Sequence, residues 1–134
     1  MPERCVIVVD EALPAGLAAN AAAVLAVTLG AREPGVVGDD LVDGDDRIHA
    51  GLFRAGLPIL KAARADLRRL RDRAADAGLG VVDLPAFGQQ TNDYEEFRSA
   101  VARTAAADLD YLGLAVYGER RPVGRLTGNL SLLR

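Results

Sequence analysis

The sequence has one cysteine, one histidine, one lysine and no tryptophan among its 134 residues. The lone Cys5 excludes a disulfide within the chain and favours the reducing cytoplasm, where we expect the protein to be located. His49 has no Cys, His or Glu cluster around it, so we expect no metal site and no cofactor. Aromatic residues make up only 4% of the chain, and the core must therefore be built from Ala, Val and Leu.

Basic charge and long apolar runs are also scarce. The formal net charge is −3, whereas nucleic-acid-binding proteins normally have a basic balance, so a nucleic-acid partner is unlikely. The longest apolar stretch, residues 17–29, is shorter than the about 18 residues that a membrane span needs. We therefore expect no membrane segment and no signal peptide, and a single domain over residues 1–134.

Strand-like and helix-like patterns alternate along the chain, which predicts an open α/β sheet. Gly30 is expected to end the first helix, and Asn92 with Glu95 forms a capping-box pattern before the third. Asp43-Gly44 predicts a tight hairpin inside an otherwise irregular connection. The predicted strands are 5–9, 57–60, 81–84 and 111–117; the predicted helices are 17–29, 66–77 and 93–104, with a short helix in the tail 120–134.

Both ends of the chain resemble type-II peptidyl-tRNA hydrolases. Residues 7–26 read IVVDEALPAGLAANAAAVLA, similar to that family's opening strand, acidic turn and Gly-Lys-Ile-Ala-Ala-Gln helix start. Residues 126–133 read LTGNLSLL, similar to its closing Val-Thr-Gly-His-Leu-Lys-Leu-Leu. The resemblance implies the fold of that family.

A second resemblance covers nearly the whole chain. The stretches His49-Ala50-Gly51 and Pro58-Ile59-Leu60-Lys61, with 126–133, resemble the family catalogued as domain of unknown function two thousand. This resemblance implies an α/β fold, a four-stranded mixed sheet with helices on both faces, and a homodimer. It implies no reaction. Whether the protein is an enzyme stays open, and a hydrolase is expected if it is one.

The departures from the hydrolases concern their catalytic residues. Gly16 stands where their lysine lies, and residues 86–90 (AFGQQ) stand where their Asp-Ala-Gly-Arg-Thr stretch lies. Thr91 is one residue further on. Hydrolysis of an ester on tRNA needs a group that activates water and groups that hold a polyanion. The resemblance therefore implies the scaffold without the activity.

Three residues are candidates for catalysis. Lys61 is the only lysine among 16 basic residues, so a compact ammonium or a neutral amine has a specific use there; a solvated strand-end cation is the alternative. His49 is the default general acid or base, or else a hydrogen-bonded loop histidine. Asp10 follows the first strand, where open α/β sheets bind ligands, or else it caps a turn.

Six further residues are candidates for ligand binding. They are small or polar residues at a helix start, after the third strand, or in the apolar tail, and the alternative for each is a local backbone role. They are Gly16, Asn20, Thr91, Asn92, Thr127 and Asn129.

These residues support three hypotheses. The first is a protein that binds or modifies a small anionic or carbonyl-containing molecule, in a pocket formed by Asp10, Asn20, His49, Lys61, Thr91 and Asn129. The second is a divergent peptidyl-tRNA hydrolase. The third is a non-catalytic, dimeric interaction module.

Overall fold

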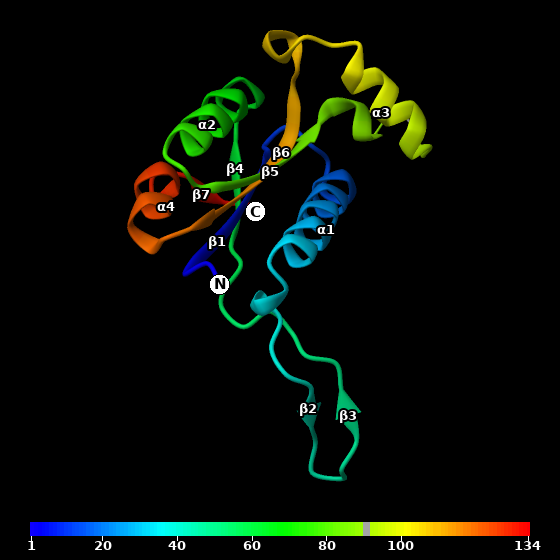
Figure 1. The fold of residues 1–134 in the computed structure, drawn as a ribbon, viewed down its shortest axis with the longest axis vertical. Coiled ribbons are helices and arrows are strands. Elements are labelled where there is room, and N and C mark those ends of the chain that lie inside the picture. Colours follow the sequence, from blue (N-terminus) through cyan, green and yellow to red (C-terminus); the bar gives the residue numbers. More distant parts are fainter. Residues whose placement is uncertain (90–91) are drawn as a thin grey trace.

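A computed structural model describes residues 1–89 and 92–134, and its main feature is a mixed five-stranded sheet (Figure 1). The strand order is β5-β6-β1-β4-β7, with β1 parallel to β4 and the other neighbouring pairs antiparallel. The strands are β1 (Arg4–Asp10), β4 (Ile59–Ala62), β5 (Gly80–Pro85), β6 (Tyr111–Gly118) and β7 (Ser131–Leu132). The α/β prediction is confirmed, but the expected four strands are wrong because the tail adds β7 beside β4.

The central strand β1 is covered on both faces. All of its residues from Cys5 to Asp10 are buried, as a continuous apolar run predicts. Ile7 and Val9 point into the core under one face, and Val6 and Val8 into the core under the other. The chain therefore has two apolar layers, one on each side of a single sheet.

Helices close both layers (Figure 1). Helix α1 (Ala15–Arg32) covers one face, and α2 (Arg64–Asp76) with α4 (Arg120–Thr127) covers the other. Short 3-10 turns connect these elements: η1 (Pro34–Val36), η2 (Ala86–Gln89) and η3 (Ala106–Asp108). The prediction of helices on both faces is confirmed.

Helix α1 is longer than the sequence predicts. Gly30 does not end it, since the helix continues to Arg32 and the N–H of Glu33 still bonds the carbonyl of Leu29. The next residue, Pro34, has no N–H and ends the regular pattern. By length and composition alone α1 is long and apolar enough to cross a membrane, although its buried face packs on the sheet. The expectation of no membrane segment stays a prediction.

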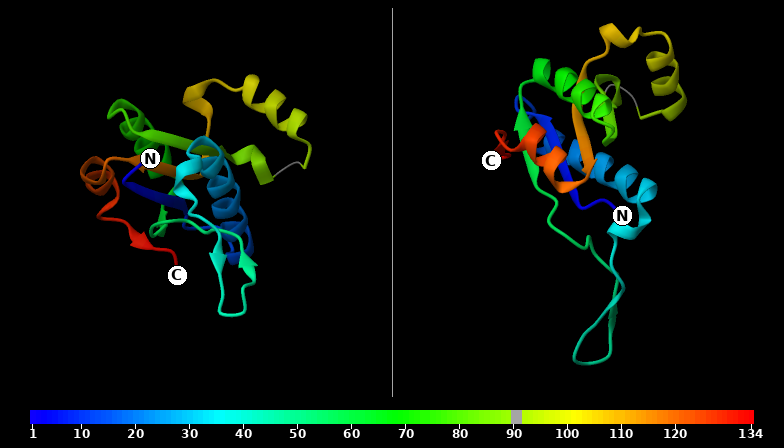
Figure 2. Two further views of the ribbon diagram at one scale, coloured as in Figure 1. Left: turned by 60° about the horizontal axis from the view of Figure 1, so that its bottom comes forward. Right: turned by 60° about the vertical axis from the view of Figure 1, so that its left-hand side comes forward.

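A two-stranded arm, residues 37–53, projects from the body beyond the C-terminal end of α1 (Figures 1 and 2). It contains β2 (Leu41–Val42) and β3 (Ile48–His49), paired antiparallel. The hairpin is confirmed, but its loop covers residues 43–47 and is wider than Asp43-Gly44 alone predicts. At its base a Cβ on Gly51 would overlap the carbonyl oxygen of Gly38. Only glycine permits the two segments to cross so closely.

Helix α3 (Tyr94–Ala102) lies apart from the layers and contributes no buried residue. Its N-cap is Asp93, whose carboxylate accepts hydrogen bonds from the N–H groups of Glu95 and Glu96. The predicted cap, Asn92, is one residue too early. Aspartate and asparagine cap helices about equally well, so the pattern alone did not separate them.

Gly113 in β6 allows α1 to approach the sheet. A Cβ there would lie 2.8 Å from the Val8 carbonyl oxygen and 3.0 Å from Leu25 Cδ1. We expect Gly113→Ala to destabilise the fold by about 1–3 kcal/mol, because the core is overpacked. Thermal or urea unfolding measures the change.

Gly30→Ala is the matched control. A Cβ at Gly30 meets no atom within 4 Å, and alanine favours a helix over glycine by about 0.5–1 kcal/mol. We expect this variant to be more stable than wild type. Equal destabilisation of both variants would show that close packing at Gly113 is not the cause.

Candidate functional site

Asp10 and Lys61 lie at the same edge of the sheet but on opposite faces. In the parallel pairing of β1 with β4, Val9 is opposite Lys61 and Asp10 is opposite Ala62. Val9 belongs to the core under α1, and Ala62 to the core under α2 and α4. Because side chains of adjacent strand residues alternate, the carboxylate and the ammonium point to different sides of the sheet.

Asp10 forms an ion pair that the sequence did not reveal. It is 3% exposed, and its Oδ2 accepts a 2.8 Å hydrogen bond from Nε of Arg64 at the start of α2. Its other oxygen accepts from the N–H of Ala12 in the turn after β1. Both carboxylate oxygens are therefore occupied, and the pair joins the end of β1 to the first turn of α2.

Lys61 is half-buried on the α1 face, opposite Ser131 of β7. Its ammonium makes no ion pair with the residues that the structure describes. This leaves the ammonium free to bind an anion or carbonyl, as the sequence predicts, but no other candidate residue is shown beside it.

His49 lies on the arm, away from both. Its Nε2 is 2.8 Å from Oδ2 of Asp43, and its side chain is 53% exposed. Asp43 also accepts hydrogen bonds from the backbone N–H groups of Asp45 and Arg47. The pair therefore holds the tip of the arm together, and the expectation that His49 shares one pocket with Asp10 and Lys61 is wrong for a single chain.

The candidates in the tail also separate. Thr127 is buried and its hydroxyl donates to the carbonyl of Val123 inside α4, so it does not form a pocket rim. Asn129 lines a cavity of about 280 Å³ between α2 and α4, with Arg69 and Arg73. Gly16 is exposed in the first turn of α1. Thr91 lies outside the described residues.

Asn20 and Asn92 are the two candidates that the fold brings together. They line one cavity of about 200 Å³, which α1, β5 and the start of α3 enclose. Leu84 of β5, Val24 of α1 and Phe97 of α3 provide apolar walls. Residues 72 positions apart in the sequence thus meet at one opening.

A second cavity of about 420 Å³ adjoins the first and shares Val24, Leu84, Tyr94 and Phe97 with it. We call the two together the α1–α3 groove. Its further lining residues come from α1, β5 and β6: Thr28, Arg32, Val81, Val82, Asp83 and Tyr117. Burial, with a smaller contribution from Glu33, raises the pKa of the Tyr117 phenol, so this residue is a neutral hydroxyl in the groove.

The sequence analysis missed the aromatic residues of this groove. Tyr94 and Phe97 are three positions apart on α3, and their ring centroids are 6.2 Å apart. Tyr94 is 72% exposed although the chain has only six aromatic residues. Two of these scarce residues, three positions apart within a predicted helix, were the signal that the sequence offered.

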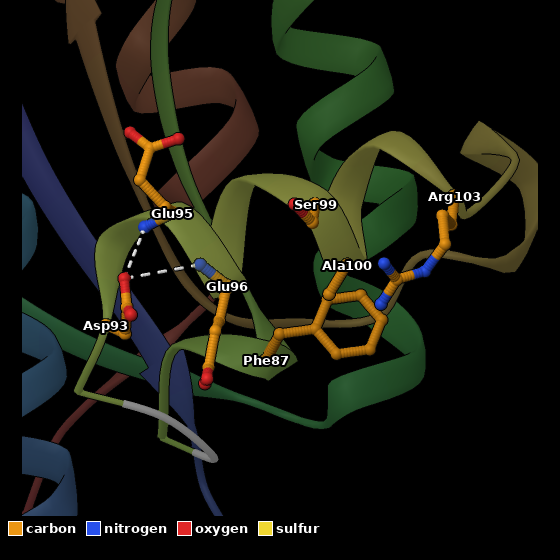
Figure 3. Close-up of a pocket in the computed structure, with 7 residues that line it drawn as sticks. All are labelled: Phe87, Asp93, Glu95, Glu96, Ser99, Ala100 and Arg103. Carbon is orange, nitrogen blue, oxygen red and sulfur yellow. Dashed lines mark hydrogen bonds between the residues drawn. The ribbon is translucent and has the colours of Figure 1, made fainter.

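A further hollow, of about 530 Å³, lies beside α3 and is open and charged. Figure 3 shows Asp93, Glu95 and Glu96 at one end of it and Arg103 at the other. Asp93 is engaged as the helix cap, as the dashed lines show. Few apolar walls and a mixed charge make this hollow a weaker candidate than the groove.

Other chemistry is sparse in the described part of the chain. No three His, Cys, Asp or Glu residues within 1–89 and 92–134 are grouped as metal ligands. Cys5 is buried, and burial together with Glu33 raises the pKa of its thiol, which keeps it protonated and unreactive.

The His49 contact gives a pH prediction. The hydrogen bond from His49, followed by those from the Arg47 and Asp45 amides, lowers the pKa of Asp43 below its ordinary value. The contact therefore stabilises the arm above the unfolded pKa of the carboxyl and is lost as the pH falls through the lower, folded pKa. We expect a carbon-13 NMR titration to show the pKa of Asp43 below the ordinary value of an aspartate, and His49→Ala to raise the Asp43 midpoint. An unchanged midpoint would contradict the contact.

Removal of Arg64 should destabilise the fold more than removal of an exposed arginine. Arg64→Ala leaves the buried carboxylate of Asp10 without its charged partner, at a cost of about 1–3 kcal/mol. Arg69→Ala breaks only a 4.0 Å surface pair with Asp66 and should cost less than about 0.5 kcal/mol. Urea unfolding of both variants provides the comparison, and similar costs would contradict a structural role for the Asp10–Arg64 pair.

Comparison with known proteins places the chain in a family. No curated protein matches it. The solved structure of the protein of unknown function Atu0240 from Agrobacterium tumefaciens strain C58 has a TM-score of 0.88 at 16% identity, with 96% of each chain covered, and so shares the fold. The model of the family "Protein of unknown function (DUF2000)" matches residues 3–134. The chain belongs to the DUF2000 family.

Proposed function

We propose that the protein binds a small, uncharged, carbonyl-containing molecule with a planar or apolar part in the α1–α3 groove. The observation that carries the proposal is the meeting of two carboxamides, Asn20 and Asn92, with the aromatic residues Tyr94 and Phe97 over one cavity. Pockets for small ligands combine mostly apolar walls with a few convergent polar groups, and this cavity has both.

The aromatic residues of α3 favour ligand binding over a role in the core. Tyr94 and Phe97 face the groove, yet α3 buries no residue. When a flat ligand covers an aromatic ring that lies over a cavity, the free energy falls because apolar surface is removed from water. The helix therefore presents a surface that a ligand completes.

The two carboxamides set the polarity of the ligand. Neither the Asn20 nor the Asn92 side chain makes a hydrogen bond to the described residues, so each amide can donate to a carbonyl and accept from an N–H. Among the described residues that line the smaller cavity none is Lys or Arg, and Asp93 contributes a carboxylate. A carbonyl or amide ligand fits this arrangement better than an anion.

The reaction, if there is one, stays open. Asp10, His49 and Lys61 lie apart in one chain, and each role assigned to them stays a prediction. The divergent peptidyl-tRNA hydrolase also stays a prediction, as does the relation of the fold to that family. A cytoplasmic location and the absence of a nucleic-acid partner are further expectations that binding in the groove does not require.

Benzamide and benzoate test the proposal as a matched pair of the same size. We expect benzamide to shift the side-chain amide signals of Asn20 and Asn92 in nitrogen-15 NMR spectra, and benzoate to bind more weakly because of Asp93. Asn20→Ala or Asn92→Ala should weaken benzamide binding about 5- to 10-fold, the value of one hydrogen bond.

Asn129→Ala is the control, since Asn129 lines the cavity between α2 and α4. It should bind benzamide like wild type. If benzamide shifts no groove signal, or if Asn129→Ala weakens binding as much as the groove variants do, the proposal is wrong.

A further inference from the structure

We infer that the arm of one chain lies along the exposed face of α1 in a second copy, so that two copies embrace each other through reciprocal arms. This goes beyond ligand binding in the groove and does not depend on it. The inference rests on the apolar surface of the arm, the apolar surface of α1, and the match of the two in length and charge.

The arm exposes apolar side chains on its surface. Ile48 is 72% exposed, Leu52 70% and Val42 64%. An isolated two-stranded hairpin is marginally stable in water. An exposed apolar surface on such a hairpin also favours association with another surface. The close crossing of Gly38 and Gly51 at its base and the Asp43 hydrogen bonds at its tip hold the arm together. Its surface is suited to a partner.

Helix α1 has a complementary surface on its outer side. Residues 15–31 contain no charged side chain, although only Ala18, Ala21, Leu25 and Leu29 are buried. Val27 is 73% exposed on the outer side. A solvated helix face normally carries charged residues, so this uncharged face is typical of a contact surface.

The two surfaces match in length and direction. Each side of the arm from its base to its tip spans seven residues, or about 23 Å at 3.3 Å per strand residue. Helix α1 has 18 residues and is about 27 Å long at 1.5 Å per residue. The arm leaves the body at the C-terminal end of α1 and points away along the molecule's long axis (Figure 1). A two-fold axis near the base of the arm therefore places each arm antiparallel to the other copy's α1.

Charge favours the same arrangement. The arm has five aspartates, at 39, 40, 43, 45 and 46, and most lie toward its tip. In the two-fold arrangement the tip reaches the N-terminal end of the other copy's α1. That end has no acidic residue in its first turn, and the positive end of a helix dipole attracts carboxylates.

A second copy is the occupant that these observations select. Both surfaces occur on one chain, and a two-fold pair covers both surfaces of both copies at once. A different protein would have to supply an apolar groove for the arm and an apolar strand for α1. Two identical chains supply both without a further component.

Light scattering after size-exclusion chromatography tests the assembly. Wild type should have twice the 14.1 kDa mass of the chain. Ile48→Asp and Val27→Asp should each weaken the dimer at least about 100-fold and give the single-chain mass, because each places carboxylates in an apolar contact. Both positions are more than 70% exposed, so the fold should survive, and circular dichroism checks this. Ala75→Asp, on the exposed side of α2, should stay dimeric.

Cross-linking separates this dimer from any other. Ile48→Cys and Ala23→Cys chains are co-expressed and treated with a short bis-maleimide; Cys5 is only 4% exposed and should not react. We expect a covalent dimer from this mixture and little from Ile48→Cys with Ala75→Cys. A monomeric wild type, carboxylate variants that stay dimeric, or equal cross-linking of the two mixtures would each overturn the inference.

Discussion

The fold depends on a central strand that has no exposed face. Each side chain of β1 from Cys5 to Asp10 must be covered, and the alternation of the strand sends the residues to two different layers. One layer needs α1 and the other needs α2 with α4. Gly113 lets α1 come close on the first side, and the Asp10–Arg64 pair attaches α2 on the second. The burial of this strand thus determines which surface of each helix remains outside.

Local patterns were sufficient to predict most of the regular structure. The β-branched run of β1 and the amphipathic pattern of α2 identify these elements because neighbouring residues determine them. Strand β7 could not be predicted, since two residues carry no periodicity and Ser131 pairs only because the tail returns to β4. The prediction that α1 ends at Gly30 was wrong for a related reason. Glycine permits a helix end but does not require one, and the buried Leu29 keeps the turn helical.

The candidate site was harder to predict because chemistry depends on the direction of a side chain, and a sequence shows only its position. Asp10 and Lys61 are at the same sheet edge, yet Lys61 is opposite Val9 and not opposite Asp10. This offset of one residue directs the two side chains to opposite faces. His49 was grouped with them because a lone histidine is noteworthy, although the hairpin pattern around it already placed it on a projecting element. Asn20 and Asn92 lie near each other because the strands that precede them, β1 and β5, run in the same direction and end at the same edge of the sheet. The α/β pattern does predict this.

Helix α1 connects the groove with the arm. Its buried residues account for four positions, and the groove uses Asn20, Val24 and Thr28 along one flank. At about 100° per residue, Ala23 and Val27 point away from the core, and Val27 lies about 20° from Asn20 around the helix, beside the groove. Burial in the core leaves the absence of charge on that side unexplained, whereas an apolar arm lying along it accounts for the absence. The uncharged stretch 15–31 of this helix can thus serve three contacts, and a single charged substitution affects a different contact according to its position on the helix.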